Sequence, residues 1–493
     1  MYIGIDLGTS GIKVIVLGDD GKVKDSAGAE LQLSRPYPLW SEQDPQQWWL
    51  GLQACMAQLS QRGALQAVKA IGLTGQMHGA TLLDGHNQII RPAILWNDGR
   101  AFAQCQQLEQ QVPQLQQLTG NLAMPGFTAP KLLWLRQHEP EQFSRVAKVL
   151  LPKDYLRFCL SGDFASDMSD AAGTLWLDMA KRDWSDELLQ ACGLNRSQMP
   201  QLYEGNQITG RLLPELAQRW GMDEVPLVAG GGDNAAGAIG AGIVSPGQAM
   251  LSLGTSGVYF AVSNGFVANP QSAVHSFCHA LPQRWHLMAV TLSAAACLQW
   301  YADNVAGVPV ATLLDELDSA GTDAAGYPAF TDIAQLPLFL PYLSGERTPH
   351  NNPDAKGVWF GLSHATDRKA LTYSVLEGVS FALAQGAAAL HACGGVPGEI
   401  NLIGGGARSR YWRQLLADVL NLALTFREGG EVGPALGAAR LAQLALQPLR
   451  SLADICPPPP VVSRHLPDSQ RHAALAARYS KFIALYQALE THF

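Results

Sequence analysis

The strongest constraint on how this chain folds is a five-residue segment that occurs twice. Leu-Gly-Thr-Ser-Gly stands at residues 7–11 and again at residues 253–257, so the copies lie 246 positions apart (253 − 7) in a chain of 493 residues. An apolar run precedes each copy and another follows it. A repeat at half the chain length, in matching contexts, indicates that the chain is a duplication of one structural unit.

Each copy is predicted to form a β-hairpin with a tight turn. The expected strands are Tyr2–Leu7 and Gly11–Val16 in the first copy, and Ala249–Leu253 and Gly257–Val262 in the second. A Gly-Thr-Ser-Gly turn presents several backbone N–H groups and two hydroxyls on one side, which makes a small concavity suited to phosphate oxygens. A single such turn is usually only a turn, and it is the repetition that favours phosphate binding.

Length and composition agree with two α/β domains, which we expect to span residues 1–245 and 246–493. Apolar residues make up 47% of the chain and charged residues 15%, as in ordinary globular proteins rather than disordered ones. Helices are expected after Asp44-Pro45, from Asp367 to His391, through most of residues 178–221, and from Arg471 to Phe493, the last one packed on the second domain.

Charge and cysteine content exclude several classes of protein. The net charge is −8 and no basic run is present, so we expect no nucleic-acid partner. No stretch approaches about 18 uninterrupted apolar residues, which argues against a membrane span. The chain opens on an apolar strand rather than a signal peptide, and its eight cysteines form no Cys-x-x-Cys pair. These features predict a cytoplasmic protein with reduced thiols and no zinc site.

Two carboxylates are candidates for the chemistry. Asp6 precedes the first turn, whereas Ser252 holds the matching place in the second, so only one turn carries a carboxylate suited to Mg²⁺; the alternative is a turn carboxylate bonded to nearby backbone. Asp233 follows three glycines at a strand end and begins a helix of small residues. It is the candidate general base and a second possible Mg²⁺ ligand, with a helix cap as the alternative. The helix N-terminus is expected to keep Asp233 ionised.

Other segments add to a phosphate-binding hypothesis. Lys13 follows the first turn and could neutralise a phosphoryl group, although a strand lysine more often faces solvent. Gly404-Gly405-Gly406-Ala407 lies between a strand and a helix and is a candidate seat for a nucleotide, or simply a turn that needs positive φ. Gly230-x-Gly232 mimics a dinucleotide fingerprint, but no acidic residue follows about 20 positions later to bind a ribose. No P-loop motif is present.

The paired turns, together with Asp233-Asn234, Pro341–Pro349 and Gly404–Leu420, resemble the superfamily of sugar kinases, heat-shock ATPases and actin. Within it, the chain is similar over essentially its whole length to the FGGY family of carbohydrate kinases. The resemblance implies an α/β fold of two duplicated actin-like, ribonuclease H-like domains with a deep cleft between them. It also implies ATP and Mg²⁺ as cofactors, with Asp6 near the metal and Asp233 as the proton acceptor.

The same resemblance implies a set of binding residues. Glycerol kinases of the family carry Arg-Glu where this chain has Met77-His78, and the Gln-Met-His-Gly form is similar to that of ketopentose kinases. The implied sugar-binding residues are Gln76, Met77, His78, Asp233 and Asn234. The implied ATP-binding residues are Gly8, Thr9, Ser10, Lys13, Gly254, Thr255, Gly405, Gly406, Ser409 and Arg410. Many relatives carry Asn soon after the glycines, where this chain has Ser409-Arg410, which leaves the contacts to the adenine base open.

The expected activity is transfer of a phosphoryl group from ATP to D-xylulose, giving D-xylulose 5-phosphate. Within the family, the alternatives are gluconate, ribulose, fuculose or glycerol as the acceptor. Outside it, the alternative is an actin-like or chaperone ATPase, for which no dedicated peptide- or filament-binding segment is found. A homodimer is left open as the assembly.

Overall fold

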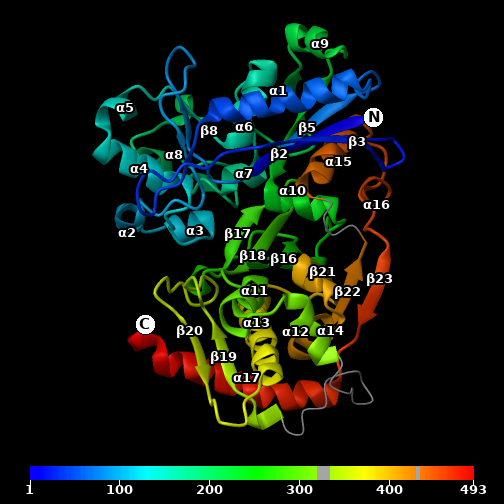
Figure 1. Ribbon diagram of the computed structural model, residues 1–493. Helices are drawn as coiled ribbons and strands as arrows, with labels where there is room; N and C mark the ends of the chain where they lie inside the picture. The colour runs from blue at the N-terminus through cyan, green and yellow to red at the C-terminus, as the bar shows by residue number, and fades with distance from the viewer. Residues whose placement is uncertain (319–332, 429–432) are drawn as a thin grey trace.

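The computed structural model describes residues 1–318, 333–428 and 433–493, arranged as two lobes stacked one above the other (Figure 1). A six-stranded sheet with the order β13-β14-β5-β1-β2-β3 forms the centre of the first lobe. Its strands are β1 (Tyr2–Leu7), β2 (Gly11–Leu17), β3 (Val23–Glu30), β5 (Ala70–Gly75), β13 (Ile208–Arg211) and β14 (Pro226–Gly232).

A seven-stranded sheet with the order β17-β18-β16-β15-β21-β22-β23 forms the centre of the second lobe. Its strands are β15 (Ala249–Leu253), β16 (Gly257–Ser263), β17 (His275–Cys278), β18 (Trp285–Thr291), β21 (Glu399–Ile403), β22 (Ala423–Arg427) and β23 (Val461–His465).

The two sheets repeat one pattern of strand pairing. The hairpin strands β1 and β15 pair antiparallel with β2 and β16 and parallel with β5 and β21, and these inner strands pair parallel with β14 and β22. An antiparallel strand, β13 or β23, then closes that edge. The duplicated α/β fold and both hairpins predicted from the sequence are therefore confirmed.

Helices cover both sheets, and the longer ones begin at side-chain caps. The Asp44 carboxylate accepts from Gln46 N at the start of α1 (Pro45–Gln61), and Asp367 accepts from Ala370 N at the start of α13 (Arg368–His391). α17 (Ser469–Leu489) packs on the second lobe, as predicted, because Phe482 and Tyr486 belong to its core. The other elements that position the site are α3 (Leu115–Thr119), α4 (Thr128–His138), α6 (Pro152–Ser161), α7 (Met168–Ala172), α11 (Ala295–Tyr301), α14 (Arg410–Leu420), β19 (Leu338–Pro341) and β20 (Gly357–Phe360).

Two helices cross where the lobes meet, namely α10 (Asp233–Gly240) and α15 (Pro434–Leu446). Helix α15 comes late in the chain yet lies among the strands of the first lobe (Figure 1). Glycines allow this approach: a Cβ on Gly4 would lie 1.9 Å from the Ala435 carbonyl oxygen, and one on Gly437 would lie 1.8 Å from the Ala236 carbonyl oxygen. Because real Cβ atoms do not approach so closely, the packing of α15 on β1 requires glycine at position 4, and the crossing of α15 with α10 requires glycine at position 437.

An apolar cluster joins the lobes on one side of the cleft. Phe277 and Met288, from β17 and β18, share a buried core with Phe127 and Trp176 of the first lobe. Asn121 reinforces the contact by donating from Nδ2 to the Ser276 carbonyl oxygen at 2.8 Å. The lobes are therefore in direct contact beside the cleft as well as at the crossing helices.

The helical prediction for residues 178–221 is wrong in part. The structure places β11 (Asp183–Trp184), β12 (Gln201–Tyr203) and β13 in this region, together with the short helices α8 (Asp186–Ala191) and α9 (Pro214–Trp220). Partners far away in the sequence stabilise strands as short as these: β12 pairs with β9 (Ala165–Asp167), and β13 pairs with β14. Within the described ranges, no helix is long and apolar enough to cross a membrane.

Candidate active site

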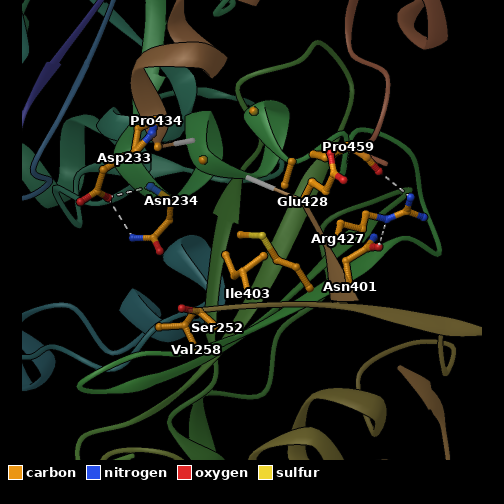
Figure 2. Close-up of a pocket in the computed structure, with 15 residues that line it drawn as sticks. Asp233, Asn234, Ser252, Val258, Asn401, Ile403, Arg427, Glu428, Pro434 and Pro459 are labelled. Atoms are coloured by element: carbon orange, nitrogen blue, oxygen red, sulfur yellow. Dashed lines mark hydrogen bonds between the residues drawn. The ribbon is translucent and has the colours of Figure 1, made fainter. Parts of the chain in front are cut away.

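A cavity of about 230 Å³ lies at the junction of the lobes (Figure 2). Asp233, Asn234 and Pro434, from the crossing helices, form one wall, and Asn401 of β21, Arg427 at the end of β22 and Glu428 after it form the opposite wall. Ser252 and Val258, from the second hairpin, form its floor in this view. The cavity therefore brings together side chains from both halves of the duplication.

Asp6 lies close to this cavity, at the end of β1. It pairs with Lys13 across the first hairpin, and a Cβ on the cavity-lining residue Gly433 would be 3.9 Å from Asp6 Oδ2. Burial and then repulsion by Asp233 raise the pKa of Asp6 to about 7, while the charge of Lys13 opposes the shift. The first hairpin and Asp233 thus converge on one space, as the sequence predicts.

Asp233 is the first residue of α10, and its Oδ1 accepts from the backbone N and the Nδ2 of Asn234, at 2.7 and 2.9 Å. Burial nevertheless raises the pKa of Asp233 to about 6, because the loss of hydration outweighs these two hydrogen bonds. The expectation that the helix N-terminus fixes the charged state was too simple. At neutral pH the group is still mostly a carboxylate and can accept a proton.

The donor set fits a hard cation such as Mg²⁺. Two carboxylates, Asp6 and Asp233, are close enough for the charge of Asp233 to raise the pKa of Asp6, and a divalent cation relieves such repulsion. In the part of the chain that the structure describes, no group of three or more His, Cys, Asp or Glu side chains could enclose a metal. An ion at this point would therefore need water and phosphate oxygens as its other ligands, which is how Mg²⁺ commonly binds.

The segment Gln76-Met77-His78 passes directly beside Asp233. A Cβ on Gly232 would lie 2.9 Å from Met77 Cγ, and a Cβ on Gly173 would lie 2.9 Å from Met77 Cε. Met77 is thus enclosed by two glycines and forms an apolar surface next to the carboxylate. The predicted sugar-binding residues Met77, His78, Asp233 and Asn234 come together in the structure.

His78 is held in a single orientation and a single tautomer. Its φ is +68°, and its backbone carbonyl accepts from Thr128 Oγ1 at 3.1 Å and from Lys131 Nζ at 2.9 Å. Its Nδ1 lies 2.6 Å from the Gly173 carbonyl oxygen, which can only accept, so Nδ1 carries the proton. Burial lowers the pKa of His78 to about 3, and the ring is neutral. Nε2 then carries no proton and can accept a hydrogen bond.

Gln76 and Thr9 meet in a buried network of side-chain amides. Thr9 Oγ1 donates to Gln76 Oε1 at 2.9 Å and accepts from Trp96 Nε1 at 2.9 Å. Gln43 Oε1 accepts from Gln76 Nε2 at 2.9 Å, and Gln43 Nε2 donates to the Thr9 carbonyl oxygen at 2.6 Å. The structure therefore uses the Gln76 amide and the Thr9 hydroxyl inside the protein, and the Gly8 N–H closes the turn by donating to the Gly11 carbonyl oxygen at 2.9 Å; the N–H groups of Thr9 and Ser10 and the exposed Ser10 side chain are left for a ligand.

The second hairpin is held in a different way. The carbonyl oxygens of Gly254 and Thr255 accept from the backbone N–H groups of Ala295 and Ala294 at the start of α11, each at 2.9 Å. Gly404, at φ +97°, packs on this hairpin, and a Cβ there would lie 2.7 Å from the Leu253 carbonyl oxygen. The predicted nucleotide segment is thus in contact with the second turn.

Within that segment the predicted ATP-binding residues differ in their exposure and in their contacts. Gly405 is exposed, with nothing within 4 Å of a Cβ added there, and Gly406 packs on Leu253. The Ser409 hydroxyl caps α14 by accepting from Trp412 N at 3.2 Å, and Arg410 begins that helix with an exposed side chain. The glycines form an open surface beside the hairpin, while Ser409 has a structural use of its own.

Sequence reasoning missed several residues of the site. Gln43 has no local signal, because its partners at positions 9 and 76 are distant in the sequence. Asn401 and Arg427 line the cavity, with Arg427 Nε donating to Asn401 Oδ1 at 2.6 Å. Asn401 lies in the middle of β21, and Arg427 ends the neighbouring parallel strand β22, so only Arg427 carried a signal in the sequence, that of a polar residue at a strand end.

Two duplicated sheets, with carboxylate and amide side chains gathered where the lobes meet, are typical of the two-domain phosphotransferases of the actin-like class. The model of the FGGY family of carbohydrate kinases, N-terminal domain, matches residues 1–240, and that of the C-terminal domain matches residues 249–446. The chain belongs to the FGGY family of carbohydrate kinases, as the sequence resemblance indicated.

Individual relatives agree with this assignment. The chain is 61% identical over 489 residues to the xylulose kinase of Escherichia coli K12, covering 99% of each protein. It is 56% identical to the xylulose kinase of Klebsiella pneumoniae, again covering 99% of each. Among solved structures, a protein described as a xyloylose kinase from Brucella ovis is 45% identical, covers 100% of both chains and superposes with a TM-score of 0.94.

Proposed function

We propose that this protein transfers the γ-phosphoryl group of ATP to D-xylulose, giving D-xylulose 5-phosphate and ADP. The identity of 61% to a xylulose kinase over nearly the whole chain supports this substrate. The structural observation that carries the proposal is the position of Asp233, which stands beside Met77 of the sugar segment and within electrostatic reach of Asp6 at the first hairpin. One carboxylate thus adjoins both expected substrates.

In this mechanism Asp233 accepts the proton of the sugar's terminal hydroxyl as that oxygen attacks phosphorus. Its two hydrogen bonds from Asn234 occupy Oδ1 and leave Oδ2 for the substrate. Met77 forms the apolar floor, and the unprotonated Nε2 of His78 accepts from another sugar hydroxyl, which orients the acceptor.

We also propose how the nucleotide is held. Backbone N–H groups at Thr9 and Ser10 would face phosphate oxygens from one hairpin, and those at Gly254 and Thr255 from the other, with Lys13 adding a positive charge. Gly8, whose own N–H donates to the Gly11 carbonyl oxygen at 2.9 Å, would let the turn approach the phosphates closely. Gly405, Gly406, Ser409 and Arg410 would line the adenosine end. Mg²⁺ bound near Asp6 and Asp233 would neutralise the charge that develops on the phosphoryl oxygens. The domain boundary at 245/246 and a cytoplasmic location are further predictions from the sequence, which leaves a homodimer open as the assembly.

A panel of acceptors tests the substrate. Purified protein with Mg²⁺ and ATP is assayed for ADP release with D-xylulose, L-ribulose, D-gluconate and glycerol. We expect a kcat/KM for D-xylulose at least about 100-fold above the others, since a site that pairs each hydroxyl rejects acceptors that leave polar groups unpaired. A higher kcat/KM for any other acceptor would assign a different sugar to the same fold.

A further inference from the structure

We propose that Arg347, which belongs to the second domain, is a sugar-binding residue that contacts the end of the ketopentose farthest from Asp233. The inference deepens the proposed function and rests on it. It gives the second lobe a direct part in choosing the sugar, in addition to its part in holding the nucleotide.

The loop that carries Arg347, between β19 and β20, is fixed on both sides of this residue. Glu346 Oε1 accepts from the backbone N of Leu292 at 2.9 Å and of Arg347 at 2.7 Å. Thr348 Oγ1 donates to the Ala273 carbonyl oxygen at 2.9 Å and accepts from Val290 N at 3.1 Å. Because the neighbours of Arg347 are bonded to the second sheet, its side chain leaves the loop in a defined direction.

That direction leads to the sugar segment of the first lobe. Arg347 Nη1 lies 3.3 Å from His275 Nε2, and the His275 ring stands 5.6 Å from the ring of Phe127. Phe127 in turn meets the ring of His78 edge-on, with centroids 4.7 Å apart. Arg347 is thus two rings away from His78, and its charge contributes to the low pKa of the His78 ring.

The hydrogen bonds around Arg347 leave most of its donors available. Asn121 Oδ1 can only accept, so His275 donates to it from Nδ1, at 3.1 Å, and accepts from Arg347 through Nε2. The Glu346 carboxylate is already engaged with two backbone N–H groups. Among the residues that the structure describes, no carboxylate forms an ion pair with Arg347, although an Arg guanidinium carries five donors.

A partly buried guanidinium with one neutral partner fits an uncharged polyol. Its planar fork of N–H groups can bond two oxygens at once, such as adjacent sugar oxygens, and the low local dielectric strengthens those bonds. Met77 packs on Gly232, the residue before Asp233, and the ring of His78, the residue after Met77, is within electrostatic reach of Arg347. A sugar whose terminal hydroxyl faces Asp233 therefore presents its other end, with the first hydroxyl and the ketone oxygen, to Arg347.

Substitution of Arg347 tests this role. In Arg347→Met we expect the KM for D-xylulose to rise by about 10- to 100-fold, the effect of losing charge-assisted hydrogen bonds. The KM for ATP should stay within about twofold. Arg347→Lys keeps the charge but not the planar fork of N–H groups, and its KM for D-xylulose should lie between those of the wild-type protein and Arg347→Met. Arg62→Met, a surface arginine paired with Asp25, is the matched control and should leave both KM values unchanged.

A second acceptor shows whether the contact is with the sugar itself. 1-Deoxy-D-xylulose lacks the hydroxyl at the end opposite the phosphorylated one, so the wild-type preference for D-xylulose over it should shrink in Arg347→Met. An unchanged KM for D-xylulose, or an unchanged preference, in a variant that keeps the wild-type melting temperature and ATP affinity would overturn the inference. If Arg347→Met does not fold, the same two readouts on Arg347→Lys decide. Failure of the wild-type protein to use D-xylulose would instead reject the proposed function.

Discussion

The two Leu-Gly-Thr-Ser-Gly hairpins occupy matching positions in their two sheets, yet different hydrogen bonds hold the two turns. Side-chain amides fix the first turn, through Gln43 and Gln76 on Thr9, whereas backbone N–H groups at the start of α11 fix the second. The first carries Asp6 where the second carries Ser252. The two copies of the duplicated unit therefore share a backbone conformation but differ in the side chains that they carry.

Under the proposed function, the different connections would direct the two copies to different ligands. Gln76 precedes Met77 and His78, so the first turn is linked directly to the sugar segment. Leu253 contacts the glycines at 404–406, so the second turn is linked to the nucleotide segment. In this account the first hairpin contributes to the chemistry and the second mainly to nucleotide binding. The predictions below test that division.

The largest expected effect comes from replacing, one at a time, the two residues that differ between the hairpins. Asp6→Asn should lower kcat by about 100-fold or more, because a carboxylate at the phosphoryl site is lost. Ser252→Ala, at the matching position, should change kcat by less than about threefold. Steady-state kinetics with saturating D-xylulose and ATP measure both. Similar losses in the two variants would show that the hairpins share the chemistry equally.

A glycine pair tests the link between the second hairpin and the nucleotide segment. Gly404→Ala places a Cβ 2.7 Å from the Leu253 carbonyl oxygen at φ +97° and should cost about 1–3 kcal/mol of stability, with weaker ATP binding. Gly405→Ala meets nothing within 4 Å and is the matched control. Thermal unfolding and ATP titration report both effects. Equal behaviour of the two variants would contradict the proposed contact.

The pH dependence of kcat/KM distinguishes Asp233 from His78. Burial raises the pKa of Asp233 to about 6, so the base is protonated below that pH and cannot accept a proton. We expect kcat/KM to fall at least about tenfold for each pH unit below about 6, where Asp6, with a pKa of about 7, is protonated as well. His78, with a pKa of about 3, stays neutral across this range, so His78→Gln should keep the same acidic limb. Loss of that limb in His78→Gln would assign the titration to His78.

The smallest expected effect concerns the amide network of the first hairpin. Gln43→Ala removes the acceptor of Gln76 Nε2 and the donor to the Thr9 carbonyl, and should lower stability by about 1 kcal/mol and kcat by several-fold. Gln47→Ala, an exposed neighbour, is the control. Thermal unfolding and kcat are the readouts. A wild-type kcat in a destabilised Gln43→Ala variant would show that the network stabilises the fold but does not contribute to turnover.

Much of the fold could be predicted from local pattern. Apolar strands flanking a repeated turn identify both hairpins, and glycines at strand ends identify the segments around Asp233 and Gly404. The packing of α15 on β1 could not be predicted, because it joins residues more than 400 positions apart whose only sign is the glycine at position 4.

Long-range contacts also explain the residues that were missed or misjudged. The ionisation of Asp233 was assigned from its helix, but burial by both lobes determines the direction of its pKa shift. Gln43 belongs to a segment with no motif of its own. Arg347 stands in the Pro341–Pro349 segment, but the resemblance of that segment does not single it out, and each residue is recognised only by the side chains that it meets in three dimensions. The sequence patterns thus indicate which backbone segments form the site more readily than which side chains complete it.

Replacement of Asp233 tests the central claim most directly. Asp233→Asn keeps the shape of the side chain and removes its ability to accept a proton, while Asp223→Asn changes an exposed aspartate in the same lobe and is the control. We predict that Asp233→Asn binds ATP within about threefold of the wild-type affinity and loses at least about 100-fold in single-turnover phosphorylation of D-xylulose, since proton acceptance contributes about 10²- to 10⁴-fold. Single-turnover rates near those of the wild-type protein would show that Asp233 is not the base.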